Sequence, residues 1–124
     1  MSLREELDAF WKAAWDQHDK KDPDVFLALY SDDCTMALPN MPMHKKKDMR
    51  PLFEMLLSSS DPVCDTTHDV IELAPGVALK TGVFTMKDKS GKQTEHWYCA
   101  TLKKYDGKWK IVCEASGNTS EPKQ

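Results

Sequence analysis

An acidic side chain, Glu114, lies within an alternating strand pattern near the end of the chain, in KWKIVCEASGN. Simple alternation puts Ile111 and Cys113 on one face of this strand and Val112 and Glu114 on the other. Acidic residues are unfavourable in strands, and an unpaired carboxylate is expensive to bury. Glu114 is therefore either solvated, held by hydrogen bonds to helix residues, or placed in an apolar pocket that raises its pKa. In the last case it could act as a general acid or base.

A tyrosine and a group of methionines are further candidates for a binding site. Tyr30, at the end of a predicted helix, could donate a hydrogen bond to a ligand, although such a hydroxyl is more often satisfied within the core. Five of the seven methionines fall between residues 36 and 55. Flexible thioethers suit either an adaptable cavity wall or ordinary gap filling. With nearby aromatic residues they would give such a wall few polar groups, which favours a small apolar or aromatic ligand. Its apolar candidates are Trp15, Met36, Phe53 and Trp97.

Composition excludes several classes of function. A chain of 124 residues with a net charge of −3 fits one domain, which we expect to span residues 1–118, followed by a loose tail at 119–124. The only dense basic cluster, Lys45 to Lys47, is too short to predict nucleic-acid binding. No segment has the length of a membrane span or the apolar stretch of a leader.

The four cysteines have no C-x-x-C spacing and no paired histidines beside them, so the sequence predicts neither a zinc site nor any other cofactor. Three of the four lie in apolar strand patterns, where a free thiol usually packs as a small buried apolar group. We therefore expect a reduced, cytoplasmic protein.

The pattern of elements predicts an α+β fold. Ser2 and Glu5 form a capping box at the start of a helix. Three helical segments come first, with one strand among them, and four long strands joined by short turns follow, which indicates a mainly antiparallel sheet with the helices on one face. The predicted helices are 2–18, 22–30 and 47–60, and the predicted strands are 32–38, 64–73, 77–88, 93–105 and 108–116.

Three stretches, ALYSDDCTMALP, GVALKTGVFTM and KKYDGKWKIVCEAS, occur in this order over nearly the whole chain. In this the chain resembles the nuclear-transport-factor-2-like (cystatin-like) superfamily, above all its SnoaL-like and calmodulin-dependent-kinase-association-like branches. The resemblance implies three helices packed in a strongly curved sheet of five or six strands, with a conical pocket open at one end. Members usually dimerise through the outer face of the sheet. Some are enzymes and others bind ligands or assemble complexes, so the fold does not settle function.

The resemblance implies positions for the pocket residues. Glu114 matches an inward-facing acid of many relatives, and Tyr30 matches a pocket tyrosine of the ketosteroid isomerases. On the preceding strand, the residues implied to face the pocket are Trp97, Cys99 and Thr101.

Two known chemistries of the superfamily are not implied. Leu38 occupies the position of the isomerase base, and Ala14 and Thr101 occupy those of its oxyanion donors, so the carboxylate and strong donors of a proton shuttle are missing. The epoxide hydrolases need an arginine on a strand, whereas the two arginines here, Arg4 and Arg50, fall in predicted helices.

Two functions remain open at this point. One is binding of a small apolar or aromatic molecule, with weak lyase, isomerase or cyclase chemistry if Glu114 moves a proton and Tyr30 or Thr101 polarises an oxygen. The other is a non-catalytic association module with a vestigial pocket. We also expect a homodimer, because the Tyr98, Ala100 and Leu102 face of one strand would lie outside and need a cover.

Overall fold

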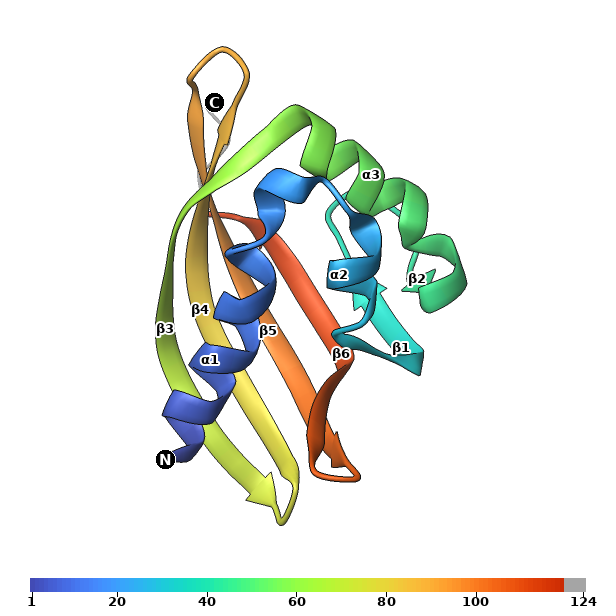
Figure 1. Ribbon diagram of the computed structural model, residues 1–124, viewed down its shortest axis with the longest axis vertical. Helices are drawn as coiled ribbons and strands as arrows, with labels where there is room; N and C mark the ends of the chain where they lie inside the picture. Colours follow the sequence, from blue (N-terminus) through green and yellow to red (C-terminus); the bar gives the residue numbers. More distant parts are fainter. Residues whose placement is uncertain (120–124) are drawn as a thin grey trace.

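The computed structural model describes residues 1–119, which form an α+β fold with the helices packed in the hollow of a curved sheet (Figure 1). Residues 120–124, most of the expected tail, lie outside the described part of the chain. The predicted β4 and β5 match the observed bounds, whereas the first two helices end earlier than predicted and a short β2 was not predicted. In chain order the elements are α1 (Leu3–Trp15), η1 (His18–Lys20), α2 (Pro23–Leu27), β1 (Tyr30–Ala37), β2 (His44–Lys45), η2 (Lys46–Asp48), α3 (Arg50–Ser59), β3 (Ser60–Ala74), β4 (Val77–Asp88), β5 (Gln93–Tyr105) and β6 (Lys108–Asn118).

Local signals explain where the helices begin. The Ser2 hydroxyl accepts from the amide of Glu5, and the Glu5 side chain accepts from the amide of Ser2, so both halves of the predicted capping box are present. Asp22 caps α2, and Pro23 follows at the first helical position. Proline is tolerated there because the N–H that it lacks would have no partner within the helix. Each short helix then buries its apolar side chains against the sheet.

The six strands follow the order β2-β1-β6-β5-β4-β3. All neighbours are antiparallel except β1 and β6, which run parallel and join the helical half of the chain to its end. The hairpin between β5 and β6 turns through Asp106 and Gly107, both at positive φ, as a two-residue turn of the primed type requires. Three register shifts along β3 fit the strong curvature of this edge of the sheet.

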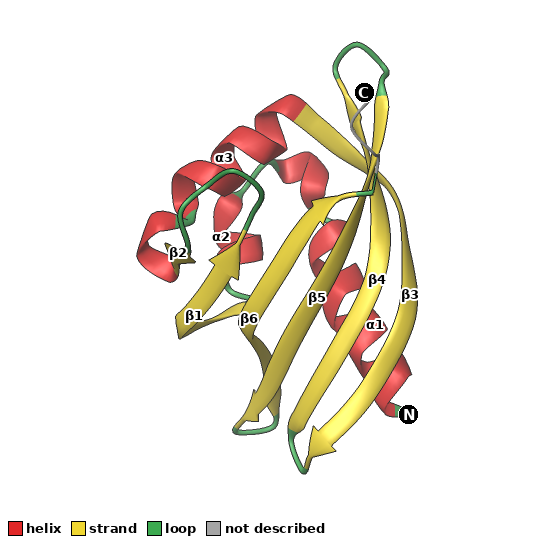
Figure 2. Ribbon diagram, turned by 180° about the vertical axis from the view of Figure 1, so that it is seen from behind, coloured by secondary structure: helices red, strands yellow, loops and turns green. Residues whose placement is uncertain are grey.

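The helices all lie on the concave face, and the opposite face is bare (Figures 1 and 2). Inward-pointing side chains of β5 and β6, such as Leu102 and Ile111, are fully buried together with Leu7 of α1. No helix within residues 1–119 crosses the outer face.

An extra residue in β6 decides which of its side chains point inward. Thr101 pairs with Cys113, but its neighbour Leu102 pairs with Ile111, so Val112 has no partner and forms a β-bulge. Because of this bulge, Ile111 and Glu114 lie on the same, inner face, although strict alternation separates them. The sequence-based assignment of Ile111 and Cys113 to one face is therefore wrong, and Cys113 is exposed.

The faces of β5 are also the reverse of those expected, because the bulge in β6 changes which side of β5 lies next to the inward-facing Glu114. Tyr98, Ala100 and Leu102, which we expected outside, are 6%, 0% and 0% exposed and point into the core. The opposite face of the strand is the uncovered one, and there Trp97 is 43% exposed.

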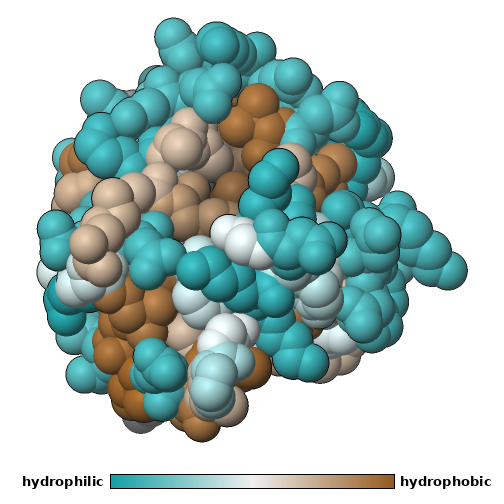
Figure 3. Space-filling view, turned by 60° about the horizontal axis from the view of Figure 1, so that its bottom comes forward, coloured by the Kyte–Doolittle hydropathy of each residue, from teal (hydrophilic) through white to brown (hydrophobic). Residues whose placement is uncertain are grey.

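Some apolar side chains remain in contact with solvent elsewhere, and Figure 3 shows brown apolar patches among hydrophilic residues on the face that it draws. Of the four cysteines only Cys34 is buried, contrary to the expectation that three would pack inside.

The observed register makes a direct prediction about stability. Leu102→Ala should lower the free energy of unfolding by about 2–5 kcal/mol, because it removes buried methyl groups from the core. Thr101→Ala, one residue away on the bare face, should change it by less than about 1 kcal/mol. Urea unfolding at neutral pH measures both values, and a larger loss for Thr101→Ala would contradict the register.

Candidate functional site

A cavity of about 400 Å³ lies between the helices and the concave face of the sheet. Aromatic, leucine and methionine side chains form most of its wall, and the loop Pro39 to Met41 lies at its rim. Phe26 stacks on Phe53 at 5.7 Å, and Trp15 meets Phe26 edge-on at 5.0 Å. This volume and lining are typical of a small-molecule pocket, in which a few polar groups set the orientation of a ligand.

The main polar contact in this cavity joins Glu114 of β6 to Tyr30 at the start of β1. The Tyr30 hydroxyl donates to Oε1 of Glu114 over 2.7 Å. Tyr30 is 5% exposed, and its ring packs 5.8 Å from Phe53. Among the described residues no other donor reaches Glu114, so its second oxygen, Oε2, is available to a ligand.

Burial raises the pKa of Glu114 to about 7, while the Tyr30 hydrogen bond and the Lys80 charge partly oppose the rise. Burial and the neighbouring carboxylate together raise the pKa of Tyr30 well above its ordinary value, so that its hydroxyl stays protonated. A carboxyl group that changes charge near neutral pH can both accept and donate a proton, which is the requirement for general acid–base chemistry.

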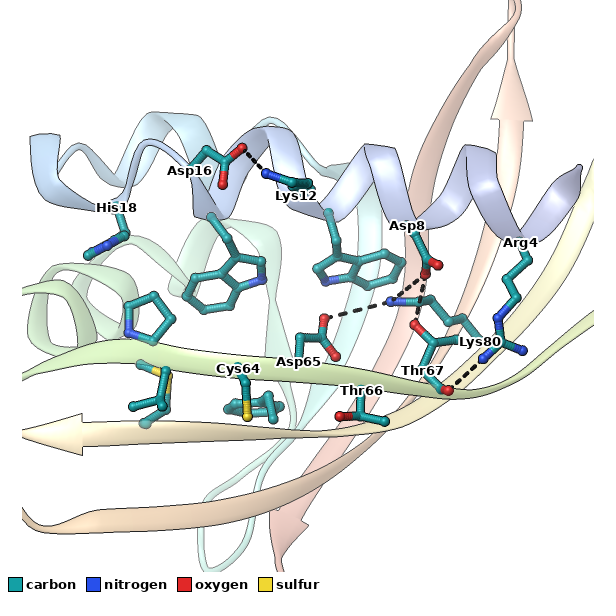
Figure 4. A pocket seen from close by; sticks show the side chains of 16 residues that line it. Arg4, Asp8, Lys12, Asp16, His18, Cys64, Asp65, Thr66, Thr67 and Lys80 are labelled. Atoms are coloured by element: carbon teal, nitrogen blue, oxygen red, sulfur yellow. Dashed lines mark hydrogen bonds and ion pairs between the residues drawn. The ribbon is translucent and has the colours of Figure 1, made fainter. Parts of the chain in front are cut away.

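A second polar cluster lies in a groove of about 750 Å³ between α1 and β3 (Figure 4). Lys80 of β4 is only 1% exposed, and its Nζ donates to the Tyr98 hydroxyl over 2.8 Å. Asp8 and Asp65 each lie 3.8 Å from this Nζ, and the Trp11 ring lies 4.2 Å from it. Burial lowers the pKa of Lys80, whereas the two carboxylates oppose that change. The ammonium is thus fully enclosed by its own partners.

This cluster adjoins the cavity. Tyr98 donates to Asp65 over 3.1 Å, and burial, with the Asp65 charge, raises its pKa. The groove and the cavity share part of their walls, because five residues line both: Trp11, Trp15, Asp65, Phe84 and Met86. Gly82 allows this arrangement, because a Cβ there would lie 2.7 Å from the Tyr98 hydroxyl.

Five of the eight predicted site residues come together at the cavity: Trp15, Tyr30, Met36, Phe53 and Glu114. The other three, Trp97, Cys99 and Thr101, lie on the outer face of β5. If β5 and β6 paired without a bulge from their turn onward, Cys99 would lie opposite Glu114. An inward-facing Glu114 would then imply that Trp97, Cys99 and Thr101 also face inward. The bulge at Val112 sets Ala100 there instead, and this one-residue slip is the physical reason for the correction.

Three polar residues at or beside the cavity were not predicted from the sequence: Asp65, Lys80 and Tyr98. Lysine is normally solvated, so its place in a strand attracted no attention. Its neighbours on the same face, Ala78 and Gly82, are small and were the available signal that a long side chain lies over them. His96 also lines the cavity, stacked on Phe84 at 5.0 Å.

Among residues 1–119, no three histidine, cysteine or acidic side chains converge as metal ligands do. In the same range no helix is both long and apolar enough to cross a membrane.

Comparisons with known proteins agree with this architecture. The model of the SnoaL-like domain family matches residues 4–112. The chain belongs to this family. Comparison with curated proteins gave no match.

Solved structures similar to this SnoaL-like domain share its fold. A putative calcium/calmodulin dependent protein kinase II association domain from Xanthomonas campestris is 22% identical, with a TM-score of 0.81 over 98% of this chain and 91% of that one. A ketosteroid isomerase-like protein from Erwinia carotovora atroseptica is 16% identical, with a TM-score of 0.76 over 92% and 94%. An NTF2-like protein from Cytophaga hutchinsonii is 15% identical, with a TM-score of 0.74 over 95% and 99%. At these identities the likeness shows a common fold and nothing finer.

The raised pKa of Glu114 predicts how stability depends on pH. Between the ordinary value of 4.5 and about 7, the folded protein retains a proton that the unfolded chain has released. Stability should therefore fall as pH rises through this window, by up to roughly 3 kcal/mol. Glu114→Gln should remove this decrease, whereas Cys113→Ser, at the exposed neighbouring position, should retain it. Urea unfolding at intervals from pH 4.5 to 8 measures the effect, and identical profiles for wild type and Glu114→Gln would contradict it.

Proposed function

We propose that this SnoaL-like domain binds a small molecule with an apolar or aromatic body in the cavity beside Glu114. The observation that carries the proposal is a cavity of about 400 Å³ with an aromatic and methionine-rich wall and a carboxyl group held by Tyr30 at its base. The stability of the fold does not require such a cavity, since apolar interiors are normally packed without large voids.

The same arrangement supports acid–base chemistry of the lyase, isomerase or cyclase type on a bound molecule. Glu114 would move the proton, because its pKa of about 7 lets it hold or release one near neutral pH. Once Glu114 has taken up a proton, Tyr30 would turn its single hydroxyl proton from Glu114 to an oxygen of the ligand and polarise it, a role that Thr101 cannot share from the outer face of β5. The ketosteroid isomerase-like neighbour is too distant to assign a reaction.

Binding of an uncharged fluorescent probe tests the proposal. N-phenyl-1-naphthylamine should bind with one site per chain and gain fluorescence as it enters the apolar cavity. Ser116 lines the cavity on the inner face of β6, so Ser116→Phe should fill the space and weaken binding by at least about tenfold. Cys113→Phe adds the same ring on the exposed face and should leave the affinity within about twofold. Equal binding by both variants, or none by wild type, would refute the proposal.

We also propose that the bare outer face of the sheet pairs two copies of the chain. The middle of this face carries Val83, Trp97, Cys99, Thr101 and Ala115, the charged residues Glu95 and Lys103 lie toward the two ends of β5, and no helix within residues 1–119 covers it. A sheet face with an uncharged centre of this kind can pack on an identical copy through a two-fold axis.

Light scattering after size-exclusion chromatography at micromolar concentration should therefore give twice the mass of one chain. Trp97→Lys should yield the monomer, because it places an ammonium in the centre of the interface. Lys103→Ala, at the exposed end of β5, serves as the control and should remain dimeric. A monomeric wild type would exclude the dimer, and a ring of many copies would favour the association module instead.

A further inference from the structure

The charged groups facing the cavity are unusually one-sided. Among its lining residues, Asp65 and Glu114 carry carboxyl groups, and no lysine or arginine is present. His96 also faces the cavity, but burial lowers its pKa, so it is uncharged at neutral pH. An anionic ligand would meet these two acidic groups here and no cationic lining residue.

The nearest buried cation is already neutralised. Lys80 donates to Tyr98 and lies 3.8 Å from both Asp8 and Asp65. It lines the groove on the other side of Trp11 and not the cavity itself. The register sets Lys80 and Glu114 in one row across the sheet, with Ala100 between them. Since two inter-strand spacings amount to about 10 Å, Lys80 does not form an ion pair with Glu114.

Arg4, the other cation of this region, is also engaged. Its guanidinium donates to the backbone carbonyls of Thr67 and His68, over 2.6 and 3.3 Å. Glu114 is consequently the one carboxylate of the cavity without a cationic partner among the described residues.

The wall of the cavity favours positive charge as well. Aromatic rings present a negative face to a bound group and attract cations at distances up to about 6 Å. Within the protein this interaction is already in use, because the Lys80 ammonium lies over the Trp11 ring at 4.2 Å. Rings that line the cavity together with Glu114 include Trp15, Phe26, Tyr30, Phe53, Phe84 and Tyr98.

We propose that the ligand of this cavity is a hydrophobic amine bound as its ammonium cation, with the nitrogen at Oε2 of Glu114 and the apolar body against the aromatic wall. The inference rests on the proposed small-molecule function and names its ligand class. A neutral or anionic molecule of the same shape would leave the Glu114 carboxylate without its cation.

Binding of an ammonium group beside Glu114 should make the affinity for the amine depend on pH. The titratable groups around Glu114 are Tyr30 and Cys34 of β1 and Lys80 of β4, together with Asp65, His96 and Tyr98, which line the same cavity from β3 and β5, whereas α2 and α3 contribute only apolar lining residues. A bound ammonium favours the carboxylate and therefore releases the proton that Glu114 holds when its pKa is about 7. Affinity for the amine should rise from pH 6 to pH 8, where the amine itself stays protonated.

Isothermal titration calorimetry with three indole derivatives tests the ligand class. Tryptamine, tryptophol and indole-3-acetate share one ring system but carry an ammonium, a hydroxyl and a carboxylate. At pH 8 tryptamine should bind at least about tenfold more tightly than tryptophol, and indole-3-acetate should bind most weakly. The advantage of tryptamine should shrink at pH 6, and titrations in phosphate and Tris buffers should show net proton release on binding.

Glu114→Gln should abolish the preference for tryptamine and keep the affinity for tryptophol, whereas Cys113→Ser should behave as wild type. Equal binding of tryptamine and tryptophol at pH 8, or tighter binding of indole-3-acetate, would overturn the inference while leaving the small-molecule function in place. If the protein binds N-phenyl-1-naphthylamine but not tryptamine, the amine inference is again overturned and the small-molecule function remains. A protein that binds neither would overturn both.

Discussion

A single unpaired residue in β6, Val112, sets the geometry on which the cavity depends. The bulge turns both Ile111 and Glu114 toward the helices, and it moves Ala100 opposite Glu114. The methyl group of Ala100 leaves space above this row of the sheet, so that Glu114 can reach the Tyr30 hydroxyl. Without the bulge, and with Leu102 and Ile111 still inside, Glu114 would pair with Cys99 and its carboxyl group would point to the outer face of the sheet.

The interior keeps its charges in two separate places. In the groove beside α1, an ammonium is surrounded by a phenol, two carboxylates and an indole ring, a fully partnered arrangement that a buried lysine requires. In the cavity, the Glu114 carboxyl has one hydrogen bond and no ion pair. Removing a carboxylate from water without a counter-charge is unfavourable, and the raised pKa of Glu114 reflects this cost. Glu114 thus has fewer hydrogen-bond and charge partners than the buried Lys80, as is common where a ligand completes the hydrogen bonding.

Much of the fold could be predicted from the sequence, because alternation and turn residues are local signals. The bounds of β4 and β5 followed from GVALKTGVFTM and from the glycines that precede and separate the strands. Glu114 was singled out as an acidic residue in a strand pattern, and the family resemblance implied that it and Tyr30 face a pocket; their contact joins residues 84 positions apart. The inward face of β5 could not be predicted, because Val112 carries no glycine or proline signal of a bulge. Lys80 was missed because its burial depends on Asp8 and Asp65, which come from α1 and β3.

Titration of the Glu114 side chain tests the central claim, that the bulge buries this carboxyl group in the cavity. With ¹³C-labelled glutamate, the carboxyl resonance assigned through Glu114→Gln can be followed by NMR between pH 3 and 9. The account predicts a midpoint near pH 7, moved higher in Tyr30→Phe because the hydrogen bond from Tyr30 lowers the pKa of Glu114. A midpoint near 4.5, unchanged by loss of the Tyr30 hydroxyl, would show that Glu114 lies in water and would contradict the account.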